Sequence, residues 1–287
     1  MKILVTGGAG YVGSVLVKKL LEKNIQVCVV DNLMYDNGHS ILPFFGTSKF
    51  KFIKGDVRDE VLMKGLVHNF DFVIHLAAIV GFPACRKNPH LAQTVNVDSS
   101  KLISSLMSKE QGTVYASTGS NYGIIENQIC TEETPLNPIS LYGKTKTEAE
   151  NIFLNENQAV AYRFATAFGL SPRMRLDLLI NDFVYQAINN KLLVMFEKTF
   201  KRTFIHVSDM ANAIIHAIDN YDSMKNNTYN VGGDSNNYSK EEIALMIKEK
   251  IDYYLHFAEV GEDEDKRNYE VSYKKINDAG FFINKTV

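Results

Sequence analysis

Residues 1–23 read MKILVTGGAGYVGSVLVKKLLEK, and the stretch TGGAGYVGS at residues 6–14 places four glycines in nine positions. Glycine in an ordered turn is entropically costly, so it marks a place where the backbone bends tightly or is approached closely. Residues 2–6 are apolar enough for a strand, and residues 11–23 carry an apolar face at helical spacing. Taken alone, a glycine-rich strand–helix connection is more often a flexible turn than a binding loop, so its context must decide.

Beyond this stretch, short apolar runs alternate with longer amphipathic segments. The periodicity predicts helices over 11–23, 98–109 and 140–155, and strands over 2–6, 26–31, 50–57, 71–78, 113–118 and 159–165. Such alternation is typical of an α/β protein with a doubly wound parallel sheet, whose ligands bind at the carboxyl ends of the strands. After about residue 165 the pattern becomes less regular, which predicts a smaller second lobe.

The composition excludes several classes of partner. The 287 residues are 45% hydrophobic and 22% charged, with a net charge of −2, so neither nucleic acid nor a membrane surface is an expected partner. The first apolar run is too short for a signal sequence or a spanning helix. Cys28, Cys85 and Cys130 are scattered and without metal-ligand spacing. They fit reduced thiols in a cytoplasmic protein that has no metal site.

The glycines have a specific meaning between a strand and a helix. Gly7, Gly10 and Gly13 let the backbone approach a pyrophosphate, and the helix N-terminus presents N–H groups and a positive dipole to it. The second strand ends in Asp31, 18 residues after Gly13, where a carboxylate accepts hydrogen bonds from ribose hydroxyls and repels a 2′-phosphate. This pattern predicts NAD as cofactor. Asp56, after the third strand, is compatible with an adenine contact and equally with a helix cap.

We therefore expect a Rossmann-type NAD-binding domain over residues 1–165, to which the chain returns near 204–233. Residues 166–287 are expected to form mainly a substrate-binding lobe.

A reaction is indicated by the segment YGKTK at residues 142–146. Tyr142 and Lys146 lie four residues apart and so share one face of a helix. A neighbouring ammonium favours the phenolate and brings a tyrosine, whose ordinary pKa is about 10, toward the range of a general base. Thr118 closes the fifth strand, where its hydroxyl is placed to share a substrate alcohol proton with Tyr142. A surface Tyr/Lys pair on a helix is common, so this spacing alone is a weak signal.

Taken in order, the motifs resemble those of the extended short-chain dehydrogenase/reductases, the NAD-dependent nucleotide-sugar epimerases and dehydratases. They are TGGAGYVG, the strand end at Asp31, HLAA at 75–78, ST followed by NYG at 121–123, YGKTK, KRTFIHVSDMANAI at 201–214 and YNVGG at 229–233. The resemblance covers essentially the whole chain. It implies a catalytic set of Thr118, Tyr142 and Lys146, in which Lys146 also binds the nicotinamide ribose. It implies NAD contacts from Gly7, Gly10, Tyr11, Val12, Gly13, Asp31, Asn32, Asp56, Val57, Leu76, Ala77, Ala78, Tyr142 and Lys146.

The resemblance also implies a substrate site in the second lobe. By motif match, Arg202 and Arg267 are the arginines that bind the diphosphate of a nucleotide sugar, a task that suits the guanidinium fork. Thr118 and Asn181 are expected to contact the substrate as well. The arginines of the run 173–175 are compatible with ordering this lobe over the sugar and equally with an ordinary surface. A homodimer formed through the helices near 98–109 and 140–155 is a further implication of the resemblance.

Departures from the family pattern narrow the reaction. Dehydratases of the family carry Asp and Glu where this chain has Gly119 and Ser120, so a 4,6-elimination lacks its acid and its base. Oxidation at C4 of the sugar remains, either as a net dehydrogenase or, if the hydride returns to the opposite face, as a 4-epimerase. The segments at 31–45, 77–89 and 163–184 resemble a bacterial branch that includes GDP-heptose 4-dehydrogenases of surface-polysaccharide synthesis. We therefore expect C4 oxidation of a GDP-linked manno-heptose or hexose, with the 4-epimerase as the alternative.

A non-catalytic NAD-binding sensor is a further reading of the same fold. Such proteins usually lose the tyrosine or the lysine, whereas this chain retains Tyr142, Lys146 and Thr118. The retained set favours an enzyme.

Overall fold

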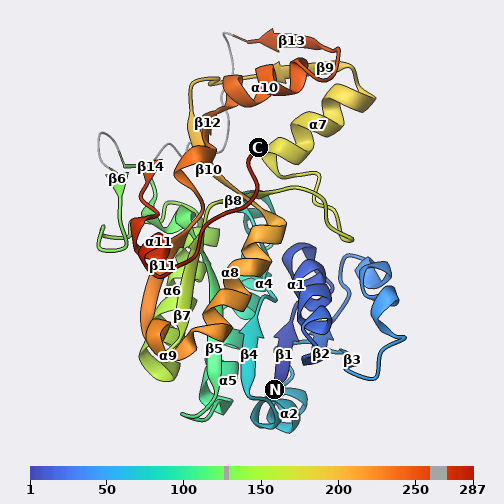
Figure 1. The fold of residues 1–287 in the computed structure, drawn as a ribbon, viewed down its shortest axis with the longest axis vertical. Coiled ribbons are helices and arrows are strands. Elements are labelled where there is room, and N and C mark those ends of the chain that lie inside the picture. The colour runs from blue at the N-terminus through green and yellow to red at the C-terminus, as the bar shows by residue number, and fades with distance from the viewer. Residues whose placement is uncertain (126–128, 259–269) are drawn as a thin grey trace.

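A seven-stranded parallel sheet forms the body of the molecule (Figure 1). The structure is a computed structural model and describes residues 1–125, 129–258 and 270–287. The strand order is β3-β2-β1-β4-β5-β7-β11, and every pairing in this sheet is parallel. The strands are β1 (Lys2–Thr6), β2 (Gln26–Asp31), β3 (Phe50–Lys54), β4 (Phe72–His75), β5 (Gly112–Thr118), β7 (Val160–Phe164) and β11 (Asn227–Val231). The predicted doubly wound Rossmann-type fold is confirmed.

Helices cover both faces of this sheet, so its central strands are buried along most of their length. In β1, all residues after Lys2 are buried. On one face α1 (Tyr11–Glu22) packs against α8 (Val207–Asp219), and Figure 1 shows the two helices in front of the strands. The other face is covered by α2 (Glu60–Leu66), α5 (Ser99–Leu106) and α6 (Leu141–Asn157). Two buried apolar clusters result, one for each face.

The helix expected to begin at residue 98 begins earlier. After α3 (Phe82–Lys87), the short helix α4 (Pro89–Gln93) continues through a π-helical turn at Thr94–Asp98 into α5. Inside this turn Asn96 donates a hydrogen bond to the Ile79 carbonyl at 3.0 Å and accepts one from the Ile79 N–H at 2.7 Å. The widened turn therefore points a polar side chain inward, where it fixes the loop after β4.

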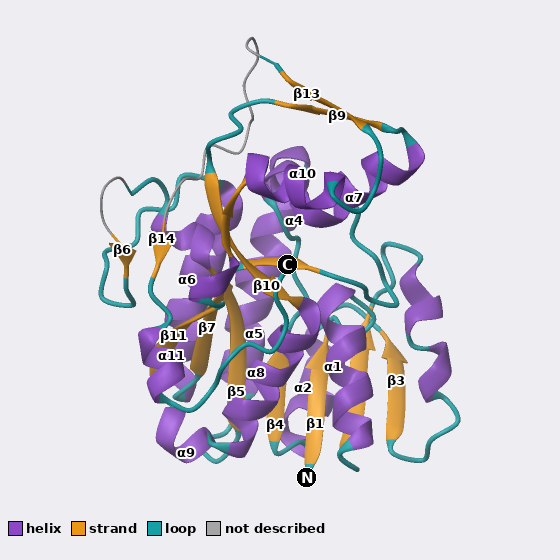
Figure 2. Cartoon of the chain, turned by 45° about the horizontal axis from the view of Figure 1, so that its top comes forward, coloured by secondary structure: helices purple, strands orange, loops and turns teal. Residues whose placement is uncertain are grey.

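A second, smaller lobe lies above the carboxyl ends of the strands (Figure 2). Its core is a separate apolar cluster. Its three-stranded sheet consists of β8 (Thr166–Phe168), β10 (Lys201–His206) and β12 (Asn237–Ser239). Around it lie α7 (Leu179–Asn189), α10 (Lys240–Lys248) and the paired strands β9 (Leu192–Met195) and β13 (Tyr254–Phe257).

The chain crosses between the lobe and the sheet more than once. After β10 it returns through α8 and α9 (Tyr221–Met224) to β11, which adds a strand beside β7. Near the carboxyl end of the chain, β14 (Glu270–Val271) pairs with β6 (Ile129–Cys130), and α11 (Lys274–Asp278) packs on β11. The lobe is thus built from segments inserted between parts of the sheet domain.

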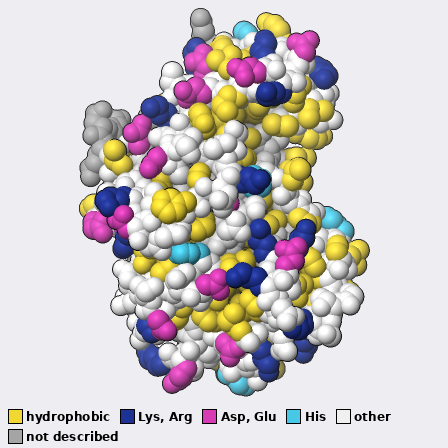
Figure 3. All heavy atoms as spheres, in the orientation of Figure 1, with side chains coloured by type: hydrophobic (Ala, Val, Ile, Leu, Met, Phe, Trp, Pro, Cys, Tyr) yellow, Lys and Arg dark blue, Asp and Glu magenta, His cyan; other side chains and the backbone are white. Residues whose placement is uncertain are grey.

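The surface carries charges of both signs. On the face drawn in Figure 3, basic and acidic side chains are interspersed among neutral ones. Of the helices in the described ranges, none is long and apolar enough to cross a membrane.

Candidate active site

One cavity of about 910 Å³ opens at the carboxyl ends of the sheet strands and extends under the second lobe. Sixteen of the residues singled out from the sequence line it: Gly7, Gly10, Tyr11, Val12, Gly13, Asp31, Asn32, Asp56, Val57, Leu76, Ala77, Ala78, Thr118, Tyr142, Lys146 and Arg202. Arg267 lies outside the described residues. The cavity therefore joins the glycine-rich loop, the Thr/Tyr/Lys set and the lobe in one space.

The glycine-rich loop forms a cradle that side chains would fill. A Cβ added to Gly13 would lie 2.3 Å from the Gly7 carbonyl oxygen, and Gly7 itself has a φ of +69°. Gly10 precedes α1 and supplies no side-chain cap for the N–H groups of its first turn. A bare backbone at the start of a 12-residue helix is the arrangement that pyrophosphate oxygens require. The loop therefore fits the dinucleotide predicted from the sequence.

Two carboxylates mark the end of the cavity at β2 and β3. Asp31 accepts hydrogen bonds from the N–H groups of Ala9 at 3.1 Å and Leu33 at 2.9 Å, and burial raises the pKa of its carboxyl. Asp56 lies at the same end and forms an ion pair with Arg58 at 2.7 Å. Hydrogen bonds from Arg58 lower the pKa of Asp56 to about 2. The Asp31 carboxylate at this end of the cavity disfavours a 2′-phosphate.

The helix-cap alternative for Asp56 was wrong. The N-cap of α2 is Asp59, whose carboxylate accepts a hydrogen bond from the Leu62 N–H at 3.0 Å. The position of Asp56 on the cavity wall is compatible with the adenine contact, which stays a prediction.

The Thr/Tyr/Lys set is placed by the end of β5 and the first turns of α6. Ser140 caps α6, and its hydroxyl accepts a hydrogen bond from the Gly143 N–H at 3.0 Å. Tyr142 lies in the first turn and Lys146 one turn later, both on the cavity wall. Thr118 is the last residue of β5, and its hydroxyl donates a hydrogen bond to the Ser120 hydroxyl at 3.1 Å.

Lys146 is buried although it carries an amine. Its side chain is 5% exposed, and its Nζ lies 4.2 Å from the centre of the Tyr115 ring. Burial lowers the pKa of Lys146 to about 7, although the nearby Glu150 carboxylate acts in the opposite direction and raises it. A lysine with its pKa near neutrality can donate hydrogen bonds to a cofactor ribose. In its charged form it stabilises a neighbouring phenolate.

The structure places Asn181 beside the cavity rather than in its wall. Its amide nitrogen donates to the Arg175 carbonyl at 2.9 Å and to the Tyr11 hydroxyl at 3.3 Å, and its oxygen accepts from the Gly169 N–H at 3.0 Å. These bonds join α7 to the loop after β8 and to the first residue of α1. The contacts seen here are those of a residue that shapes the lobe, and the expected substrate contact finds no support in them.

Several charged residues that line the cavity were not singled out from the sequence as site residues. Arg175 lines the cavity with its ion-pair partner Asp177, at 2.5 Å, and Arg173 lines it too, so both arginines of the run 173–175 are cavity residues. Lys240 also lines the cavity, is 3% exposed, and donates a hydrogen bond to the Phe196 carbonyl at 3.2 Å. Nothing in the local sequence marks Lys240, because it begins an ordinary amphipathic helix and meets Phe196 only through folding.

Comparison with known proteins shows the family of the chain. Residues 3–232 match the family model described as "NAD dependent epimerase/dehydratase family". UDP-arabinose 4-epimerase 1 of Arabidopsis thaliana is 30% identical over 313 residues, covering 94% of this chain and 74% of that protein. UDP-glucose 4-epimerase of Corynebacterium glutamicum is 28% identical over 276 residues, covering 87% and 80%. The crystal structure of UDP-glucuronic acid 4-epimerase from Bacillus cereus, in complex with UDP-glucuronic acid and NAD, superposes with a TM-score of 0.88 at 25% identity, covering 99% and 95%.

The chain therefore belongs to the NAD-dependent epimerase/dehydratase family. It is an NAD-dependent enzyme, as its glycine-rich loop, Asp31 and the Thr/Tyr/Lys set had indicated.

Replacing Asp31 with Asn tests the basis of NAD selectivity. If Asp31 binds the ribose hydroxyls as predicted, the variant loses the charge for that contact and for repelling a 2′-phosphate, so we expect NAD affinity to fall about 10- to 100-fold. The Kd for NADP should fall relative to that for NAD. Isothermal titration calorimetry on protein stripped of bound dinucleotide measures both values. The exposed Asp36, which does not line the cavity, provides the matched control Asp36→Asn. If the ratio of the Kd for NADP to the Kd for NAD were unchanged in the Asp31 variant, this role of Asp31 would be contradicted.

Replacing Lys146 with Met tests the cost of its burial. The unfolded chain keeps the ordinary pKa of 10.5, whereas the folded chain has about 7. Burial of the ammonium therefore opposes folding fully below about pH 7, and less as the pH rises toward 10.5. We expect the melting temperature of the variant minus that of the unaltered protein to be higher at about pH 6 than at about pH 9. Lys144→Met, at an exposed position of the same helix, is the control. If the difference in melting temperature between the variant and the unaltered protein were the same at both pH values, the lowered pKa of Lys146 would be ruled out.

Proposed function

We propose that this protein is a nucleotide-sugar 4-epimerase, which oxidises the C4 hydroxyl of a nucleotide sugar and reduces the ketone again from the other face. The observation that carries the proposal is one cavity lined by the glycine-rich loop, by Thr118, Tyr142 and Lys146, and by Arg202 of the second lobe. Relatives named UDP-glucose 4-epimerase and UDP-arabinose 4-epimerase support hydride return over a net dehydrogenase.

In the proposed reaction, the chain's own residues handle the proton. The Tyr142 phenolate takes the proton of the C4 hydroxyl and gives it back when the ketone is reduced, while the Thr118 hydroxyl orients the same oxygen. Lys146 supports the phenolate with its positive charge and binds the cofactor ribose. Bound NAD supplies the acceptor for the C4 hydride and its return.

Elimination of water is not part of the proposal. The positions that supply the acid and the base in dehydratases hold Gly119 and Ser120. Glycine has no side chain, and a serine hydroxyl does not titrate in the neutral range. Ser120 instead accepts a hydrogen bond from the Thr118 hydroxyl. Its place beside Thr118 on the cavity wall suits a polar contact to the sugar.

The lobe end of the cavity suits a diphosphate. Arg202 and Lys240 are 3% exposed each, and both line the cavity from elements that pack together, β10 with β12 and the start of α10. A guanidinium and an ammonium in a dry site are strong ligands for phosphate oxygens. We propose these two as diphosphate ligands. Arg267 stays a prediction in the same role.

The identity of the sugar is the most specific part of the proposal. The relatives reported above are named for UDP-sugars, which favours a UDP-linked hexose or pentose over the GDP-linked heptose expected from the segments at 31–45, 77–89 and 163–184. Both remain candidates for direct test, as does net 4-dehydrogenation. The cytoplasmic location and the homodimer through α5 and α6 also stay predictions from the sequence.

The substrate is found with a panel of nucleotide sugars. We expect one member among UDP-glucose, UDP-arabinose, UDP-glucuronic acid, GDP-mannose and GDP-manno-heptose to give a new stereoisomer of unchanged mass on liquid chromatography with mass spectrometry. The panel is run with and without a 2-oxoacid, which reoxidises any bound NADH. Loss of two hydrogens would establish a net dehydrogenase instead. Loss of water would contradict the assignment of Gly119 and Ser120.

Replacing Tyr142 with Phe separates catalysis from cofactor binding. The variant lacks the hydroxyl that moves the proton, so turnover should fall about 100- to 10,000-fold. The Kd for NAD, measured by calorimetry, should stay within about threefold because phenol and benzene rings fill the same space. Tyr185→Phe, at an exposed position of α7, is the matched control. Persistent turnover in Tyr142→Phe would refute its role, and wild-type binding of NAD with no turnover of any panel member would favour the sensor reading.

A further inference from the structure

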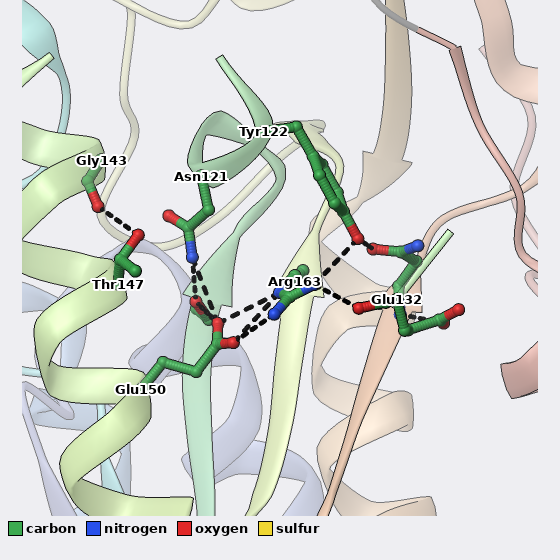
Figure 4. Close-up of polar contacts among 9 residues, drawn as sticks. Asn121, Tyr122, Glu132, Gly143, Thr147, Glu150 and Arg163 are labelled. Carbon is green, nitrogen blue, oxygen red and sulfur yellow. Dashed lines mark hydrogen bonds and ion pairs between the residues drawn. The ribbon is translucent and has the colours of Figure 1, made fainter. Parts of the chain in front are cut away.

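A buried carboxylate lies on the same helix as the Tyr/Lys pair, and the mechanism above gives it no role. Glu150 follows Lys146 by one helical turn on α6 and is 1% exposed. It does not line the cavity. Figure 4 shows its side chain reaching from α6 toward Arg163 and Asn121, which come from other elements.

One oxygen of Glu150 holds both ends of the turn that carries Thr118. Ser117, the residue before Thr118, donates its hydroxyl hydrogen bond to Oε2 of Glu150. Asn121, three residues after Thr118, donates from Nδ2 to the same Oε2 at 3.1 Å and to the Ser117 hydroxyl at 3.0 Å. The segment between these two anchors contains Thr118 and its hydrogen-bond partner Ser120.

The other oxygen of Glu150 is fixed by Arg163 on β7. The guanidinium donates to Oε1 at 2.6 Å from Nη2 and at 3.1 Å from Nε. Arg163 also donates to the Tyr122 hydroxyl at 3.1 Å, the residue directly after Asn121 (Figure 4). The carboxylate therefore cannot turn away from the Thr118 segment without breaking a buried ion pair.

Stability alone does not account for this arrangement. A buried ion pair gains little over well-packed apolar side chains, because both ions lose their hydration. Asn121 adds a cost, since its Oδ1 is buried and has no hydrogen-bond partner among the residues that the structure describes. Its amide nitrogen is nonetheless directed at Glu150 and Ser117. The network joins one turn to one helix, and this defined geometry explains its presence better than stability does.

We propose that Glu150 is a positioning residue, whose carboxylate fixes the turn that carries the Thr118 hydroxyl relative to the helix that carries Tyr142 and Lys146. The catalytic part of this inference rests on the proposed function, because it assumes that the three side chains act on one substrate oxygen. Its structural part does not: the loss of the carboxylate should loosen the turn whatever the substrate is.

The test uses a charge-balanced pair of substitutions. The double variant Glu150→Met/Arg163→Met removes both buried ions together, so no uncompensated charge remains in the core. Ser117→Ala is a second, milder variant, which removes one anchor and leaves the ion pair in place. The matched control is Lys23→Met/Asp219→Met, which removes an exposed ion pair of 2.8 Å that links the end of α1 to α8 on the other face of the sheet.

Two readouts are made on the NAD-bound protein. Hydrogen exchange of residues 119–122 should be at least about tenfold faster in both test variants than in the control. With the sugar identified by the panel, kcat should fall about 10- to 100-fold in the double variant, because a displacement of about 1 Å can cost about 100-fold. In the double variant the KM and the Kd for NAD should stay within about threefold, since neither Glu150 nor Arg163 lines the cavity.

The outcomes separate this inference from the proposed function. Unchanged exchange in the turn, or a fall in kcat no larger than in the control, would overturn the positioning role while leaving the epimerase intact. A parallel rise in KM and Kd would show general disruption and would overturn it as well. Where no nucleotide sugar is turned over, hydrogen exchange decides the positioning role on its own.

Discussion

The close approach of β1 and β4 is the constraint on which the rest of the site depends. The two strands are paired in parallel, and the chain leaves them toward opposite edges of the sheet. At their carboxyl ends the backbone of Gly7 lies so close to Ala77 that an added Cβ would be 2.6 Å from the Ala77 nitrogen. No side chain fits there. The crevice that opens beyond this contact is where a doubly wound sheet binds its ligand, and the cavity begins at this point.

The helix α6 connects that crevice to the chemistry. It carries Tyr142 and Lys146 on the cavity side and Glu150 one turn deeper, all on one helical face. Burial makes the Lys146 amine sensitive to its surroundings, and the nearby carboxylate partly restores its charge. The same carboxylate reaches across to the turn after β5. In the proposed mechanism, cofactor binding, proton transfer and the placement of Thr118 share this one helix, which suits a reaction that needs all three groups on one oxygen.

Much of this arrangement was readable in the sequence because its signals are local. Apolar runs and helical spacing predicted six of the seven sheet strands, and the glycines with Asp31 predicted NAD, since both depend on neighbouring residues or on one strand–helix unit. The motif at 142–146 likewise needs only one turn of helix. The seventh strand, β11, was harder to predict, because its pairing with β7 depends on a return of the chain from the lobe. Asp56 illustrates the same limit: a helix follows it closely, yet Asp59 provides the cap.

The amino-acid sequence by itself determined the class of fold, the cofactor and the residues that can transfer a proton. Those properties follow from periodicity, from the absence of side chains at three glycines and from a four-residue spacing. Only the tertiary structure decided that Asn181 bonds to the Arg175 carbonyl, that Lys240 lies in the cavity beside Phe196, and that Glu150 joins Ser117, Asn121 and Arg163. The physical reason is distance along the chain: these partners meet through packing of separate elements, and no local pattern records which buried polar groups will pair.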